Sequence, residues 1–110
     1  MLSKENRLKK KKDFESVFEK GESIKGQSIY LKFLKTKEPF TRIGFIVSKK
    51  VSPKAVERNK IKRRLRESVR NIPLNKGVDI IIIASLKIKK NTFEEIKEDI
   101  ERTIKKIKNV

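Results

Sequence analysis

The segment 56–70 carries the densest set of groups in this sequence that could do chemistry, and those groups are cations. Placed on a helix at about 100° per residue, its polar side chains gather on one face beside an apolar stripe. That face carries Asn59, Lys62, Arg63, Arg66 and Arg70. An Arg guanidinium binds a phosphate through two parallel hydrogen bonds, and each neutralised phosphate releases a counterion. The segment therefore favours a nucleic-acid-binding surface over a merely solvated basic face.

Groups for acid–base or metal chemistry are scarce. The chain contains no Cys and no His, which excludes a disulfide framework, a thiolate metal site and imidazole catalysis. One group of acids, Glu94, Glu95, Glu98 and Asp99, precedes a run of lysines. Acids early and cations late in a helix complement its dipole, which explains this group better than a metal site does. We predict no catalytic residue and no metal ligand in the polypeptide.

Composition extends the same expectation to the whole chain. Among 110 residues, 31 Lys and Arg oppose 14 Asp and Glu, which gives a net charge of +17 and a pI near 10.3. Such an excess predicts a polyanionic partner, RNA or DNA rather than a membrane. The sequence contains no long apolar run and no signal-peptide pattern, so we expect a cytoplasmic protein. Its length predicts one domain over residues 1–110.

The N-terminal segment is predicted to place a basic arm beside two aromatic side chains. Residues 1–12 are expected to form a flexible basic arm. Asp13 is predicted to cap a short helix that ends at Gly21. Phe14 and Phe18 lie on one side of that helix. They could be ordinary core residues, or they could form a surface on which bases stack.

Alternating apolar residues predict two strands, over 28–34 and 42–48. The first strand turns Tyr30 and Lys32 away from its apolar face. In the second strand, Ile43, Phe45 and Val47 share one face, and Gly44 leaves the opposite face open to a close approach.

Two further strands and two helices complete the predicted fold. An extended piece around 23–25 is expected to pair at the sheet edge, and the apolar run 78–86 is expected in the sheet interior. Between the main strands, Ser52 is predicted to cap the basic helix, with Pro53 in its first turn. The core stripe of that helix is Ile61, Leu65, Val69 and Ile72.

The last helix follows Asn91. Thr92 and Glu95 have the spacing of a capping box. Its predicted core stripe is Phe93, Ile96, Ile100, Ile104 and Ile107.

Residues 55–66, Ala-Val-Glu-Arg-Asn-Lys-Ile-Lys-Arg-Arg-Leu-Arg, resemble the Arg-Asn-Arg-x-x-Lys-Arg type motif of the bacterial ribonuclease P protein family. Further segments resemble that family in the same order and spacing. They are 6–10, 13–14, 17–18 with Gly21, 42–44, 47–50 and 79–84. A lone basic motif would be weak support, whereas the ordered set covers nearly the whole chain.

The resemblance implies an α+β sandwich in the order α-β-β-β-α-β-α, with about four strands and three helices. It also implies a left-handed βαβ crossover in place of the right-handed default. In this family the catalyst is an RNA. The protein subunit binds that RNA and the 5′ leader of precursor tRNA, and it assists endonucleolytic removal of the leader. Mg²⁺ is then expected to be held mainly by the RNA, with no cofactor held by the protein alone.

The resemblance also implies roles for individual residues. The RNA-binding set is Arg58, Asn59, Lys60, Lys62, Arg63, Arg66, Lys49, Lys50, Arg7, Lys9 and Lys10. The leader cleft would be lined by Phe14, Phe18, Tyr30 and Lys32. Two positions depart from the family pattern. Lys60 replaces the usual Arg with a point charge, and Lys32 stands where relatives can have an aromatic residue, a part that Tyr30 could take over.

Two other classes of function compete with this one. A structural ribosomal or other basic nucleic-acid-binding protein would share the charge and have no role in cleavage. It would not require aromatic residues of the first helix beside the motif. A protein nuclease would commonly need converging carboxylates or a His base, and the sequence offers no convincing set.

Overall fold

The computed structural model describes residues 4–70, 72 and 77–107. Its elements follow the predicted order α-β-β-β-α-β-α, which confirms the α+β fold. The 3₁₀ helix η1 (Lys4–Asn6) precedes α1 (Lys11–Lys20), β1 (Glu22–Lys25), β2 (Ile29–Lys35) and β3 (Arg42–Ile46). Then follow α2 (Ala55–Ser68), β4 (Val78–Ala84), the 3₁₀ helix η2 (Ile88–Lys90) and α3 (Phe93–Lys105).

The four strands form one mixed sheet in the order β1-β2-β4-β3. Strands β1 and β2 are antiparallel, β2 and β4 are antiparallel, and β3 and β4 are parallel and joined through α2. The apolar strand β4 lies between two others, and Ile80, Ile81 and Ile82 are fully buried, as the sequence predicted. The left hand of the crossover stays a prediction from the resemblance.

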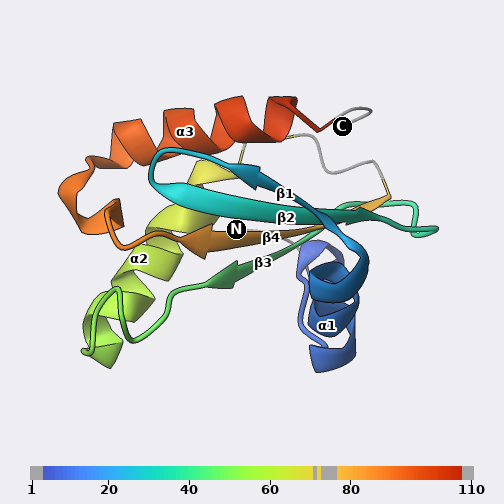
Figure 1. Ribbon diagram of the computed structural model, residues 1–110, viewed down its shortest axis with the longest axis horizontal. Helices are drawn as coiled ribbons and strands as arrows, with labels where there is room; N and C mark the ends of the chain where they lie inside the picture. Colours follow the sequence, from blue (N-terminus) through green and yellow to red (C-terminus); the bar gives the residue numbers. More distant parts are fainter. Residues whose placement is uncertain (1–3, 71, 73–76, 108–110) are drawn as a thin grey trace.

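Helices α2 and α3 cover one face of the sheet. Their buried side chains pack in one cluster with Leu31 of β2 and with Ile80 and Ile82 of β4. The helix residues in that cluster are Ile61, Leu65, Ile96, Ile100 and Ile104, with Val69 and Ile107 just beyond the helices. Figure 1 shows α3 above the sheet and α1 below it, at the right-hand end of the view. The predicted helical stripes therefore build the core, except that Phe93 is half-buried and outside this cluster and Ile72 is half-buried and packs against it.

The opposite face of the sheet carries a smaller cluster under α1. Leu8, Val17 and Ile81 are buried there, and Phe14 is among the half-buried side chains packed against them. Because side chains alternate along a strand, Tyr30 and Lys32 of β2 point to this face. Tyr30 is 44% exposed, so α1 covers only part of the face.

The structure corrects both predicted N-caps of the first two helices. Helix α1 begins at Lys11, and its N-cap Lys10 makes no side-chain cap bond. Asp13 lies inside the first turn and pairs with Arg42 instead. Helix α2 begins at Ala55, because the chain first makes a turn that closes from the Val51 N–H to the Ser48 carbonyl. Ser52 is buried in that connection and accepts a hydrogen bond from the Lys54 N–H.

The predicted flexible arm over residues 1–12 is wrong for its described part, residues 4–12. Leu8 is only 5% exposed, and its N–H donates to the Ile43 carbonyl at 3.0 Å. Arg7 forms a parallel β-bridge with Ile43. The physical reason is the single apolar Leu8 among cations, which gains from burial on the sheet and ties its basic neighbours to β3.

The capping box of α3 is confirmed, and its acidic group divides in two. Thr92 Oγ1 accepts from the Glu95 N–H, and the Thr92 N–H donates to Glu95 Oε1. Asp99 is 1% exposed and accepts hydrogen bonds from the backbone of Gln27 and from Ser28. Burial would raise the pKa of Asp99, but these bonds and one from Arg102 outweigh it and hold the pKa below its usual value. Asp99 therefore fastens α3 to the turn that leads into β2.

Candidate nucleic-acid interface

Helix α2 presents cations on two flanks of its buried stripe. Ile61 and Leu65 face the core, which fixes the rotation of the helix about its axis. Lys62 and Arg66 then lie on the flank beside β3, and Lys60 and Arg64 lie on the flank beside η2. Lys62 and Arg66 belong to the predicted basic face, whereas Lys60 and Arg64 lie on the other flank and line a separate groove.

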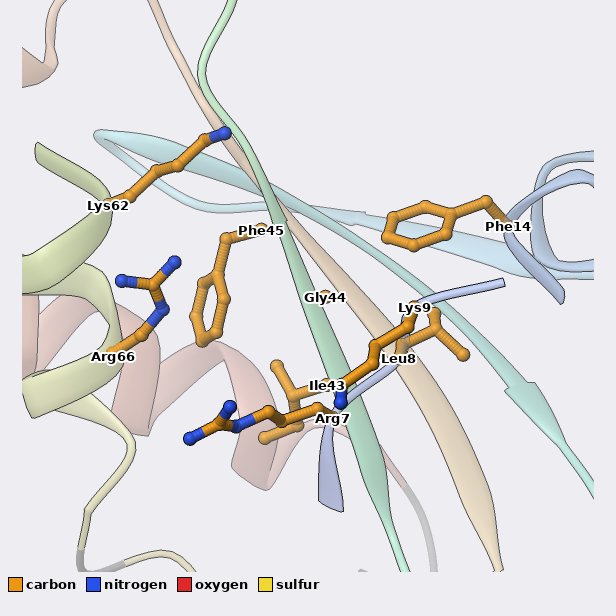
Figure 2. Close-up of a pocket in the computed structure, with 9 residues that line it drawn as sticks. All are labelled: Arg7, Leu8, Lys9, Phe14, Ile43, Gly44, Phe45, Lys62 and Arg66. Atoms are coloured by element: carbon orange, nitrogen blue, oxygen red, sulfur yellow. The ribbon is translucent and has the colours of Figure 1, made fainter. Parts of the chain in front are cut away.

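The first groove, which we call the β3 groove, encloses about 460 Å³ along the outer edge of the sheet. Its lining residues are Arg7, Leu8, Lys9, Phe14, Ile43, Gly44, Phe45, Lys62 and Arg66. Figure 2 shows Lys62 and Arg66 reaching from α2 toward β3, with the ring of Phe45 beside them. Arg7 and Lys9 approach from the N-terminal segment.

The β-bridge at Ile43 is what brings these four cations together. It places Arg7 and Lys9 on the side of β3 that also faces α2, although Lys62 and Arg66 are more than fifty positions later in the chain. Four cations around an apolar, aromatic floor suit a phosphate together with a planar base. The same groove offers no carboxylate, so it suits an anion and not a metal ion.

Phe14 and Phe45 lie on opposite sides of β3 in the β3 groove (Figure 2). A Cβ at Gly44 would lie 2.5 Å from Cζ of Phe14, so the ring rests directly over this glycine. The close approach predicted at Gly44 is therefore made by a side chain of the same protein. Phe14 is half-buried and is neither a pure core residue nor a fully open one.

A second collection of side chains, which we call the aromatic surface, consists of Phe18, Tyr30 and Lys32. Phe18 is 42% exposed and Tyr30 is 44% exposed, whereas Val17 between the two phenylalanines is fully buried. The Lys32 ammonium lies over the Phe18 ring, 5.5 Å from its centroid. Of the two interpretations of the phenylalanines, simple core packing is wrong for Phe18.

The remaining predicted RNA-binding residues occupy different surroundings. Arg58 is half-buried and donates from Nη1 to the Ser52 carbonyl at 3.0 Å, so part of its guanidinium holds the connection before α2. Asn59 and Arg63 are exposed on α2. Lys49, Lys50 and Lys10 are also exposed, in the turn after β3 and just before α1, and they line neither groove described here.

The second groove, of about 280 Å³, lies between α2 and the segment before α3. Lys60 and Arg64 line it together with Glu57 and Lys89. Lys89 Nζ lies 2.5 Å from Glu57 Oε1, and its hydrogen bond lowers the pKa of Glu57. Sequence reasoning missed Arg64, because the helical wheel places it on the flank away from Lys62 and Arg66.

The described part of the chain, residues 4–70, 72 and 77–107, contains no group of three or more acidic side chains placed to hold a metal ion. It also contains no helix with the length and apolar character needed to span a bilayer.

Comparison with known proteins places the chain in a family. A model of the ribonuclease P family matches residues 2–108. The ribonuclease P protein component of Pseudanabaena sp. (strain PCC 6903) is 37% identical over 111 residues, covering 98% of this chain and 96% of that protein. That of Bacillus mycoides (strain KBAB4) is 39% identical over 108 residues, covering 96% and 93%.

A solved structure with the same fold is that of a mutant of the Staphylococcus aureus RNase P protein. It superimposes with a TM-score of 0.83 at 36% identity, covering 93% of this chain and 87% of that one. The chain therefore belongs to the ribonuclease P protein family, as the resemblance of its basic segment predicted.

Proposed function

We propose that this protein binds the catalytic RNA of ribonuclease P and the 5′ leader of precursor tRNA, and thereby assists removal of the leader in the cytoplasm. Family membership makes it a protein component of ribonuclease P, with an RNA partner in the holoenzyme. The division of labour between its surfaces is our inference from the geometry.

The observation that carries the proposal is the β3 groove. Its cations come from two elements and surround an aromatic floor, and a net charge of +17 raises the local concentration of any polyanion. We assign this groove and the exposed Asn59 and Arg63 of α2 to the catalytic RNA. The exposed Lys49, Lys50 and Lys10 would add phosphate contacts around it.

The aromatic surface suits the single-stranded leader. Phe18 and Tyr30 expose ring faces on which unpaired bases can stack, and Lys32 between them can meet a phosphate. Phe14 lines the β3 groove and lies one helical turn from Phe18, so the two surfaces adjoin. A leader held here would be positioned next to the catalytic RNA held on α2.

The polypeptide's part in the reaction is binding and positioning. The chain has no His and no Cys, and the described residues gather no acidic cluster, so its side chains do not fit a resident metal ion. We therefore assign Mg²⁺ and the hydrolysis of the phosphodiester to the RNA. What the protein supplies is a fixed arrangement of leader and RNA, which lowers the entropy lost in reaching the transition state.

Reconstitution tests this proposal. Catalytic RNA at low Mg²⁺ is assayed for cleavage of precursor tRNA with and without this chain, and the chain is assayed alone. We expect the chain to accelerate cleavage only with the RNA. An RNA-binding protein that leaves cleavage unchanged would favour the structural ribosomal alternative, and cleavage by rigorously RNA-free protein would favour a protein nuclease.

A further inference from the structure

Arg42, the first residue of β3, joins three elements. Its Nε and Nη2 donate to the two carboxylate oxygens of Asp79 on β4, at 2.8 and 2.6 Å. Its Nη1 donates to Oδ2 of Asp13 on α1, at 3.3 Å. The hydrogen bond to Asp79 raises the pKa of Arg42, so the guanidinium stays charged throughout the working range of pH.

The two carboxylates that share Arg42 differ in burial, and so in how much each depends on the ion pair. The Asp79 side chain is 4% exposed, and a carboxylate so deeply buried requires a partner. The Asp13 side chain is 26% exposed and can be hydrated without Arg42. The fold therefore depends on the Arg42–Asp79 pair. The Asp13–Arg42 pair is not required to neutralise a buried charge, so it can serve to position α1.

Few side chains of α1 are buried against the sheet, so a polar contact can affect its position. Within Lys11–Lys20, all of which the structure describes, Val17 is the one fully buried side chain. The half-buried Phe14 packs against the same cluster as Val17, so these two side chains leave the tilt of α1 partly to its polar contacts. Asp13, one turn before Val17, anchors the helix start to the sheet through Arg42.

Both phenylalanines of the proposed RNA surfaces depend on that tilt. Phe14 directly follows Asp13, and its ring rests over Gly44, two residues beyond Arg42 on the same face of β3. Phe18 lies at the other end of the helix, under the Lys32 ammonium. A change of tilt about Val17 would move Phe18 relative to Tyr30 and Lys32.

We propose that Asp13 is a positioning residue whose ion pair with Arg42 sets the tilt of α1, and so places Phe18 to receive a base of the single-stranded 5′ leader. The inference rests on the proposed function, because it concerns the same aromatic surface. It adds that leader recognition depends on a side chain that itself need not touch RNA.

The test uses Asp13→Ala in holoenzyme reconstituted with the catalytic RNA. The readout is the affinity for precursor tRNA with a leader divided by the affinity for mature tRNA without one. Removing an acid strengthens electrostatic attraction to both ligands, so the ratio removes the part that they share, and a matched control reports the part that the leader phosphates add. Glu15→Ala is the matched control, since Glu15 is an exposed acid on the same helix. We expect Asp13→Ala to lower the ratio about threefold to tenfold, within the range that stacking supplies, and Glu15→Ala to leave it unchanged.

Two further variants separate positioning from mere folding. Asp13→Glu keeps a carboxylate within reach of Arg42 and should restore most of the ratio. Asp13→Asn keeps the side-chain shape and serves if the alanine variant does not fold. An equal ratio for wild type and for whichever of Asp13→Ala and Asp13→Asn folds would overturn the inference.

Phe18→Leu distinguishes failure of the inference from failure of the proposed function. A lowered ratio for Phe18→Leu with a normal ratio for Asp13→Ala would reject the role of Asp13 and keep the leader surface. Normal ratios for both would reject the leader surface itself. If Asp13 acts through Phe18, the double variant should match Phe18→Leu alone. Independent, multiplying losses would show that Asp13 acts by another route.

Discussion

The β3 groove and the aromatic surface adjoin at Phe14, yet they offer different kinds of side chain to a ligand. The groove gathers Arg7, Lys9, Lys62 and Arg66, whereas the aromatic surface sets Lys32 beside two exposed rings. Contacts to phosphates are strongly salt-dependent and carry no sequence information. Stacking on rings is less salt-dependent and requires unpaired bases. Under the proposed function, this contrast assigns the folded catalytic RNA to the β3 groove and the single-stranded leader to the aromatic surface.

The two regions also differ in how firmly the core holds them. Ile61 and Leu65 of α2 are buried in the main core, and Val69 at its end joins them, so Lys62 and Arg66 project from a well-packed helix. Helix α1 contributes the buried Val17 and the half-buried Phe14 to a smaller cluster, and the Asp13–Arg42 ion pair adds to its support. Variants that loosen the sheet under α1 should therefore disturb the aromatic surface before the β3 groove.

The largest effect should come from Asp79→Ala, which removes the buried partner of Arg42. Breaking one side of a buried ion pair destabilises by about 3–5 kcal/mol, and the 20% exposure of the Arg42 side chain favours the lower end. Urea denaturation of the free protein measures the loss. Glu94→Ala, an exposed acid in the first turn of α3, serves as the matched control. A change of less than about 1 kcal/mol would mean that the pair does not hold β3 and β4 together.

Arg66→Ala tests the groove side of the comparison. Loss of a charge-assisted contact should weaken binding of the catalytic RNA by about 1–3 kcal/mol. The slope of log affinity against log salt should also fall by about one. Filter binding over a salt series measures both, with Lys105→Ala, an exposed cation on α3, as the control. An unchanged slope would place Arg66 away from the RNA.

Phe18→Leu tests the aromatic side. Because stacking is worth about 1–3 kcal/mol per base and leucine keeps part of the apolar contact, we expect a selective loss of about 1 kcal/mol for precursor tRNA with a leader. Mature tRNA should bind as before, and the salt slope should stay the same, because no cation is removed. Equal losses for both tRNAs would erase the distinction between the two surfaces.

The smallest effect should be the pH dependence of folding stability that Asp99 confers. Asp99 fastens α3 to the turn before β2, the strand that carries Tyr30 and Lys32. Its folded-state pKa lies below the unfolded value, so its contribution to stability is present at neutral pH and is lost as the pH falls below about 4. Asp99→Asn should weaken the wild-type decline in this range. Urea denaturation at pH 7 and at pH 3 measures it, and identical declines would exclude Asp99 as a source.

Much of the fold was predictable, because burial leaves a local period in the sequence. The four successive isoleucines of β4, the stripe of Ile61 and Leu65 on α2, and the Thr92–Glu95 box at the start of α3 are each local to one element. The residue types of the basic face were likewise visible without coordinates. Local periodicity tells which side of an element is apolar, and the structure keeps those sides.

The amino-acid sequence by itself determined the elements, the excess of positive charge and the family resemblance. Only the tertiary structure decided which residues far apart in the sequence lie in contact. It paired Arg7 with Ile43, placed Phe14 over Gly44, and brought Arg7 and Lys9 into one groove with Lys62 and Arg66. It also turned Asp13 and Asp99 from expected helix-end charges into links to Arg42 and to the Gln27–Ser28 turn. Such contacts join residues far apart in the chain, and their partners depend on how the packed faces fit together, which no local pattern specifies.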